Sequence, residues 1–295
     1  MKLPPSLRAL RPHQWSKNLF VLAAAAFALG DVGLDVPRAA LLHVVLAFFA
    51  FCLNASAIYV LNDILDREGD REHPEKRFRP IAAGEISVAS AGVLGAACAV
   101  LGLGLAWQAG VFPILLAYTV NNVFYSKWLK HMVLVDVFSI AAGFLLRVLA
   151  GGQAAGVGLS HWLLLCTLLL ALFLACAKRR SELALLGSDA AKHRLALAGY
   201  SLPFVDQLVT LFASATVLSY ALWTIDPGTV AKFEGTGLFW SVPSVIFGIG
   251  RYLHLIHTSS LGGTPTKVLL GADRAFLVNL VLWAAVVGGV LTGQF

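Results

Sequence analysis

The chain has 295 residues, of which 58% are hydrophobic and 13% are charged, and its formal net charge is +6. Ordinary soluble domains carry about a quarter charged residues, so this composition excludes that class. The basic residues stand in short stretches between long apolar runs, a distribution that favours orientation in a membrane over nucleic-acid binding.

A membrane-spanning helix needs about 20 mostly apolar residues, and nine runs approach that length. We therefore expect an all-α, polytopic membrane protein with nine transmembrane helices, forming a single domain over residues 1–295. The expected spans are 15–30, 39–61, 88–107, 111–126, 134–152, 161–178, 203–223, 238–256 and 274–292.

Positive charge separates the two sides of these expected spans. Nineteen of the 22 Lys and Arg residues fall at the N-terminus or in the even-numbered connections, whereas only Arg38 and Lys232 fall on the opposite side. Because cytoplasmic loops carry an excess of Lys and Arg, we expect the N-terminus in the cytoplasm and the C-terminus outside. The expected location is the cell membrane, which the chain crosses several times.

A charged stretch follows the second expected span and reads NDILDREGDREHPEKRFRP, residues 62–80. Asn62, Asp66 and Asp70 recur at a spacing of four, which places them one turn apart on one helical face, with Asp63 beside them. Carboxylates at this spacing repel one another, so a ladder without a cation would destabilise the helix. Oxygen ligands of this kind suit Mg²⁺, and the sequence predicts a metal site at Asn62, Asp63, Asp66 and Asp70.

Cations follow this acidic ladder, namely Lys76, Arg77 and Arg79. We expect them to neutralise the phosphates of a metal-bound diphosphate. A basic loop that only solvates lipid headgroups is the plain alternative. That alternative accounts for the cations but leaves the acidic ladder unexplained.

Further polar groups stand where the expected spans meet water. The candidate catalytic residues are Asp66, Asp70, Lys130 and Asp136. The candidate substrate-binding residues are Lys17, Asn62, Lys76, Arg77, Arg79, Tyr125, Ser126, Arg147, Lys178, Arg179, Arg180 and Glu182. Structural alternatives stay open for Lys17 as an interface anchor, for Arg147 as part of an ion pair within the bundle, and for 178–180 as a stop signal.

Nine helices with the pattern NDxxDxxxD after the second resemble the UbiA superfamily of intramembrane prenyltransferases over nearly the whole chain. More narrowly, decaprenyl-phosphate phosphoribosyltransferases are similar in the motifs NDILDREGDREHPEKRFRPIAAG, YSKWLKHMVLVDV, KRRSEL and LLGADRAF. The resemblance implies a UbiA-like bundle with a cytoplasmic-facing, Mg²⁺-dependent active site. It implies transfer of a 5-phosphoribosyl group from phosphoribosyl diphosphate (PRPP) to a polyprenyl phosphate, with release of diphosphate, toward cell-wall arabinan.

One departure from the superfamily pattern separates two activities. Members that prenylate aromatic rings carry a second DxxxD pair at the fifth helix, whereas here Ile140 stands four residues after Asp136. The missing carboxylate argues against a prenyl diphosphate donor. A transporter that uses Asp136 and Arg147 as a relay, or a scaffold without a site, would leave the acidic ladder without a purpose. The sequence leaves open the length of the prenyl chain and the number of subunits. A homo-oligomer is one of the arrangements it allows.

Overall fold

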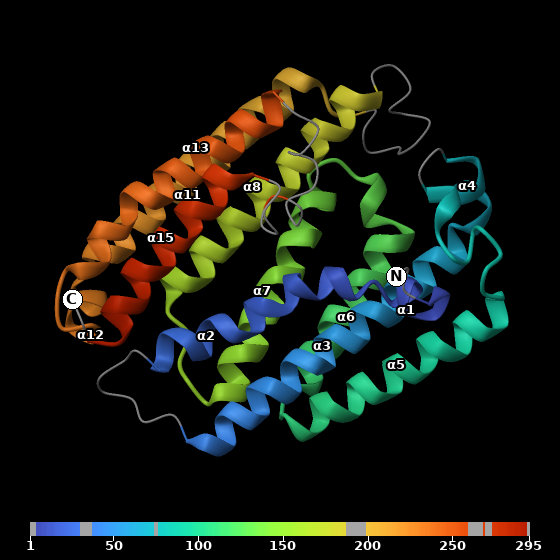
Figure 1. Ribbon diagram of the computed structural model, residues 1–295, viewed down its shortest axis with the longest axis horizontal. Coiled ribbons are helices and arrows are strands. Elements are labelled where there is room, and N and C mark those ends of the chain that lie inside the picture. The colour runs from blue at the N-terminus through green and yellow to red at the C-terminus, as the bar shows by residue number, and fades with distance from the viewer. Residues whose placement is uncertain are drawn as a thin grey trace. The chain divides into compact units, whose positions relative to one another are not determined.

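A computed structural model describes residues 4–29, 37–73, 76–186, 199–258, 268 and 273–293, and the regular elements in these ranges are all helical (Figure 1). These residues form two compact units. Unit 1 comprises Met1–Ala25, Pro37–Ser126 and Leu146–Gly158. Unit 2 comprises Ala26–Val36, Lys127–Leu145 and Leu159–Phe295.

Each of the nine expected spans overlaps an α-helix. The helices are α2 (Phe20–Leu29), α3 (Arg38–Leu65), α5 (Val88–Gln108), α6 (Phe112–Lys127), α7 (Val135–Ala155), α8 (His161–Leu186), α11 (Leu202–Ile225), α13 (Val242–Thr258) and α15 (Arg274–Leu291). Within the described ranges six of them, α3, α5, α7, α8, α11 and α15, are long and apolar enough to cross a membrane. The remaining three have 10, 16 and 17 residues. The all-helical, multi-pass fold is thus confirmed, with six helices of spanning length.

Helix α3 is the centre of unit 1 and lies along α5, as Figure 1 shows. Small residues permit this close packing, because a Cβ on Gly102 would lie only 3.0 Å from the Ala50 carbonyl oxygen. The N-terminal helix α1 (Pro5–Leu10) and the 3₁₀ segment η1 (Pro12–Leu19) also pack on α3. Polar side chains of the N-terminal segment are therefore brought to the helix that carries the acidic ladder.

Gly151 marks a second close approach in unit 1, between α7 and α2. A Cβ at this position would lie 1.9 Å from the carbonyl oxygen of Val21, a backbone atom that cannot rotate away. We expect Gly151→Ala to cost about 1–3 kcal/mol of stability through overpacking. The measurement is the apparent melting temperature in detergent. Gly104→Ala on α5 is the matched control, since no atom would lie within 4 Å of a Cβ added there, and a melting temperature equally unchanged in both variants would contradict the expectation.

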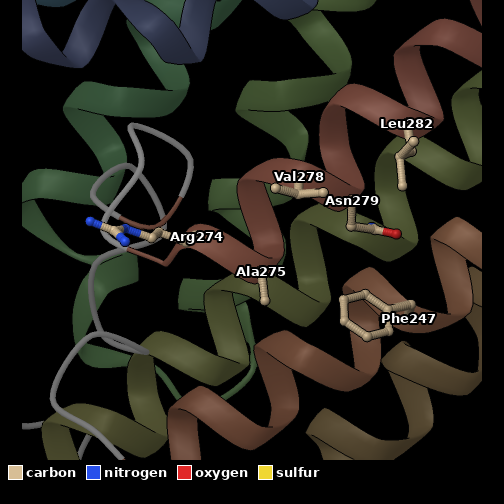
Figure 2. A pocket seen from close by; sticks show the side chains of 6 residues that line it. All are labelled: Phe247, Arg274, Ala275, Val278, Asn279 and Leu282. Atoms are coloured by element: carbon tan, nitrogen blue, oxygen red, sulfur yellow. The ribbon is translucent and has the colours of Figure 1, made fainter.

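Unit 2 is built from two helix pairs, α8 with α11 and α13 with α15. Its core includes Phe173 from α8, Val209 from α11 and Tyr252 from α13. A groove of about 470 Å³ lies between α13 and α15 (Figure 2). Its walls are mostly apolar, and none of the predicted site residues lines it. It is lined by Phe247, Arg274, Ala275, Val278, Asn279 and Leu282.

Two helices extend further than the sequence predicted. Helix α3 continues from the expected end at residue 61 to Leu65, and α8 continues from residue 178 to Leu186, so that KRRSEL is helical rather than a loop. The expected end of this span at residue 178 was wrong because charge ended the apolar run without ending the helix. Lys, Arg, Glu, Leu and Ala all favour helix, and Arg179 pairs with Glu182 one turn later.

Candidate active site

The acidic ladder spans the end of α3 and the short helix α4 (Arg67–Glu72). Asp66 stands between the two helices with φ −91° and ψ 5°, so the ladder does not lie on one uninterrupted helix as expected. The helical spacing nevertheless persists, because the Asp66 amide donates to the Asn62 carbonyl and the Asp70 amide to the Asp66 carbonyl, both at 2.8 Å. Asn62, Asp66 and Asp70 thus keep their spacing of about one turn, with Asp63 next to Asn62.

Two members of the ladder are buried and bound to arginine. Asp63 and Asp70 are 1% and 3% exposed. Nη1 of Arg79 donates to Asp63 Oδ1 at 3.0 Å and to Asp70 Oδ2 at 2.6 Å, and Arg11 also donates to Asp63 Oδ1. Such charge-assisted bonds offset the cost of burying carboxylates. The predicted ladder and the predicted cation Arg79 are therefore brought together.

The other two members face outward. Asp66 is exposed and Asn62 is half-buried. The ladder thus has a buried pair, fixed by arginines, and a more accessible pair beside it.

The donor set fits a hard divalent cation, since Asn62, Asp63, Asp66 and Asp70 offer only oxygen. Oδ2 of Asp63 is buried and has no hydrogen-bond partner among the described residues, and a metal ion would satisfy it. Within the described part of the chain no three His, Cys, Asp or Glu side chains converge as a metal-binding group, and Arg79 stands between two of the carboxylates. The metal site stays a prediction that the residues present are chemically suited to.

The predicted phosphate-binding cations near the ladder are accessible. Lys76 and Arg77 lie on η2 (Lys76–Phe78) and are exposed, and the Arg77 guanidinium lies 4.8 Å from the centroid of the Phe78 ring. Neither of these two is involved in an ion pair with the described residues. They are placed to meet an anion that arrives from solvent.

A second polar cluster lies in the interior of unit 1, and we call it the Arg147 cluster: Lys17, Asn18, Tyr118 and Arg147. Arg147 is 6% exposed and donates to Asn18 Oδ1 at 2.7 Å and to the Tyr118 hydroxyl at 2.9 Å. Lys17 lies close enough to Arg147 and Arg11 for their positive charges to repel its own. A buried cation held by neutral oxygens, with a second cation close to it, favours an anionic group nearby.

Positive charge also acts on the neighbouring His13. Burial, followed by the charges of Arg11 and Lys17, lowers the pKa of His13 below its usual value. Of these cations, Arg11 lies at the end of α3, where it donates to Asp63.

Asp136 and Arg179 form a buried network in unit 2, together with Tyr200 and Glu182. Nε of Arg179 lies 3.2 Å from Asp136 Oδ2, an ion pair without the alignment of a hydrogen bond, and Nη1 of Arg179 pairs with Glu182. The Tyr200 hydroxyl donates to Asp136 Oδ1 at 2.7 Å. Burial, and then the bond to Asp136, raise the pKa of Tyr200, so the phenol keeps its proton. Glu182, a candidate substrate-binding residue, thus pairs with an arginine of the same helix.

Arg180 has different partners from Arg179, whereas Lys178 shares Glu182 with Arg179. Arg180 donates to Asp206 Oδ1 at 2.6 Å and to the Ile256 carbonyl at 2.7 Å, near the C-terminus of α13. Lys178 lies 3.9 Å from Glu182. The three consecutive cations that were predicted to bind substrate are thus engaged with protein groups in this structure.

The predicted residues at the end of α6 are half-buried. Ser126 donates to the Asn122 carbonyl at 2.8 Å, and Tyr125 lies beside it on the same helix. In unit 2, Lys130 lies on η3 (Leu129–His131), and the turn that follows includes Leu134 with φ 66°. The Tyr200 hydroxyl accepts from the Leu134 amide at 2.7 Å and so fixes this strained turn.

Sequence reasoning missed Arg11, Tyr118 and Tyr200. Arg11 and Tyr118 contact predicted residues 52 and 29 positions away, and Tyr200 contacts Asp136 at a distance of 64 positions. A hydroxyl within an apolar run was the only signal for Tyr118. Lys267, a cation that precedes the last expected span, lies outside the described residues.

Comparison with known proteins gives three consistent results. The model of the UbiA prenyltransferase family matches residues 18–280. The decaprenyl-phosphate phosphoribosyltransferase of Corynebacterium glutamicum is 38% identical over 94% of this chain and 83% of its own length. The enzyme of that name from Mycolicibacterium smegmatis is 35% identical over 97% of this chain and 92% of its own.

Solved structures show the same fold. A UbiA homolog from Archaeoglobus fulgidus, bound to GPP and Mg²⁺, superposes with a TM-score of 0.71 at 21% identity. The match covers 98% of this chain and 99% of that one. At this identity the likeness concerns the fold alone.

Proposed function

Because the chain belongs to the UbiA prenyltransferase family, we propose that it transfers a 5-phosphoribosyl group from PRPP to a polyprenyl phosphate and releases diphosphate. The observation that carries the proposal is the end of α3, where two buried carboxylates and an exposed one stand beside cations. The decaprenyl-phosphate phosphoribosyltransferases of Corynebacterium glutamicum and Mycolicibacterium smegmatis support it, and the matches cover 83% and 92% of their lengths.

The cofactor that we propose is Mg²⁺, held by Asn62, Asp63, Asp66 and Asp70. When bound, it would supply positive charge that offsets the charge of the diphosphate and stabilises it as a leaving group. The side chains of Lys76, Arg77 and Arg79 would neutralise the remaining charge. The residues of the Arg147 cluster would bind the phosphate of the lipid.

The reaction needs little proton transfer. An oxygen of the lipid phosphate forms a bond to C1 of the ribose while the bond between C1 and the diphosphate oxygen breaks. A phosphate monoester is mostly ionised near pH 7, since its second pKa is about 6, so no general base is required. The protein's contribution is therefore to orient two anions and to stabilise the charge that develops on the leaving group.

We further propose roles for the remaining predicted residues. Lys130 is proposed to bind the 5-phosphate, and Tyr125 and Ser126 of unit 1 are proposed as substrate-binding residues. Arg179 and Arg180, because of their contacts with Asp136 and Asp206, are proposed to hold helices in place rather than to bind substrate. This assignment departs from the sequence-based one for both arginines and for Asp136.

The membrane arrangement is also part of the proposal. The excess of Lys and Arg in alternate connections supports nine crossings of the cell membrane, with the N-terminus and the active site in the cytoplasm and the C-terminus outside. The acidic ladder would then meet PRPP from the cytosol, and the lipid would arrive laterally.

Arg147→Gln tests the proposed lipid-phosphate site. We expect kcat/KM for the polyprenyl phosphate to fall by about 10- to 100-fold, because hydrogen bonds to charged groups contribute about 1.5–3 kcal/mol. The KM for PRPP should change little. Arg38→Gln, an exposed cation at the start of α3, is the control. Equal losses toward both substrates would reject a specific role on the lipid.

The test of the function itself uses purified protein, Mg²⁺, PRPP with a labelled ribose and a polyprenyl phosphate. Labelled lipid is the expected product. A second reaction offers a prenyl diphosphate and a phenol instead. Product from the second reaction with none from the first would replace this proposal by aromatic prenylation, and the absence of product from both would reject each of them.

A further inference from the structure

A single nitrogen of Arg79 occupies the space between the two buried carboxylates of the ladder. This atom, Nη1, lies 3.0 Å from Asp63 Oδ1 and 2.6 Å from Asp70 Oδ2. The two carboxylates lie close enough for their negative charges to repel each other. Buried like charges require a cation, and in this structure Arg79 supplies it.

Arg79 is less constrained than the carboxylates that it joins. Its side chain is 27% exposed, and its backbone lies in the turn after η2, outside any helix. Asp63 and Asp70 are instead carried by α3 and α4. The guanidinium can therefore leave the pair without the unfolding of a helix.

Arg11 holds Asp63 in a different way. Its backbone has φ 50°, an uncommon conformation for a residue other than glycine, and its guanidinium lies 5.1 Å from the centroid of the Tyr59 ring while it donates to Asp63. Both arginines use Oδ1 of Asp63, and Oδ2 has no hydrogen-bond partner among the described residues. Asp63 is thus fixed by Arg11 with one buried oxygen available to another cation.

We propose that Arg79 is a placeholder cation, which bridges Asp63 and Asp70 in the metal-free protein and moves to the diphosphate when metal and diphosphate bind together. Arg11 is the positioning residue that keeps Asp63 in place during this exchange. The inference rests on the proposed function, since it takes the donor to be a metal-bound diphosphate.

Electrostatics favours a concerted exchange. A divalent ion placed between the carboxylates would repel the guanidinium that stands there, so the metal alone binds against Arg79. The diphosphate brings negative charge that accepts the released guanidinium, preferably through two parallel hydrogen bonds. Metal and PRPP therefore strengthen each other's binding, and by linkage the effect is equal in both directions.

The experiment measures binding of Mn²⁺ by electron paramagnetic resonance, with and without PRPP and in the absence of lipid acceptor. A titration of Mn²⁺ with PRPP in the absence of protein corrects for the complex that these two form in solution. For the wild-type protein we expect PRPP to tighten Mn²⁺ binding by about 5- to 150-fold, the usual range of coupling between ligands. In Arg79→Gln, Mn²⁺ alone should bind more tightly than to wild type by a factor in the same range, and the coupling to PRPP should shrink.

A matched control is Arg71→Gln, which removes another cation from residues 62–80. Arg71 pairs with the exposed Glu68 and donates to the Ala82 carbonyl. Its affinity for Mn²⁺ should equal that of wild type. Arg79→Lys, which restores a positive charge at this position, should return Mn²⁺ affinity toward the wild-type value.

Three outcomes would overturn the inference, and they separate it from the proposed function. If Arg79→Gln binds Mn²⁺ no more tightly than wild type, Arg79 only stabilises the fold and does not exchange with metal. The proposed transferase function is not affected by that result. If that variant does not fold, the wild-type titration alone decides, because equal Mn²⁺ affinity with and without PRPP contradicts the exchange. If Mn²⁺ does not bind although labelled lipid still forms, both this inference and the metal site fail while the transferase activity remains.

Discussion

Replacing Asp66 with alanine is expected to lower turnover by at least about three orders of magnitude while the protein remains folded. Asp66 is the exposed carboxylate of the ladder and lies between α3 and α4, so its loss should not disturb the packing of α3. A bound metal ion stabilises the leaving group by several kcal/mol, and each 1.36 kcal/mol corresponds to a factor of ten in rate. The measurement is kcat at saturating PRPP, lipid and Mg²⁺.

Glu68→Gln is the control for this experiment. Glu68 lies two residues further on in α4, its side chain is 75% exposed, and its partners are Arg67 and Arg71 at the surface. We expect its activity to match wild type, because exposed ion pairs contribute little. If Asp66→Ala turned over at the wild-type rate, with an unchanged elution volume and melting temperature, Asp66 would not be a ligand of the metal.

Replacing Arg179 with methionine is expected to cost about 3–5 kcal/mol of stability, the largest effect on folding that we predict. The guanidinium is 1% exposed, and its loss leaves Asp136, which is 0% exposed, as an uncompensated charge. The measurement is the yield of folded protein in membranes together with the apparent melting temperature in detergent.

The double variant Asp136→Asn with Arg179→Met distinguishes charge from packing. Replacing both members of a buried ion pair by neutral side chains is often close to neutral in stability, so we expect most of the loss to be recovered. The asparagine oxygen would still accept the bond from Tyr200. A double variant as unstable as Arg179→Met alone would show that the cost arises from packing and not from the orphaned carboxylate.

The helices were predictable because each needs a long apolar run, and every expected run overlaps an α-helix. Their ends were not, since apolar periodicity says nothing about a charged helix end that satisfies its own side chains, as α8 does through Arg179 and Glu182. Length on its own also overstated what the run at 15–30 forms. There the chain makes η1 and then the ten-residue α2.

The acidic ladder and its nearby cations were predictable because their spacing and charge are local properties of the sequence. The pairing of Arg79 with both Asp63 and Asp70 was not, since it depends on the turn after η2 folding back on α3. The role of Arg11 depends further on a left-handed backbone at that residue. Such partners belong to tertiary structure, and no periodicity in the sequence encodes them.

The end of α3 as the metal and donor site is tested most directly by anomalous scattering from crystals grown with Mn²⁺ and PRPP. We predict a peak at about 2.0–2.6 Å from carboxylate oxygens of Asp63 and Asp66, the range for hard cations with oxygen ligands, and density for the diphosphate in contact with that peak. A diphosphate bound elsewhere, or a metal peak with no ligand among residues 62–70, would contradict the account.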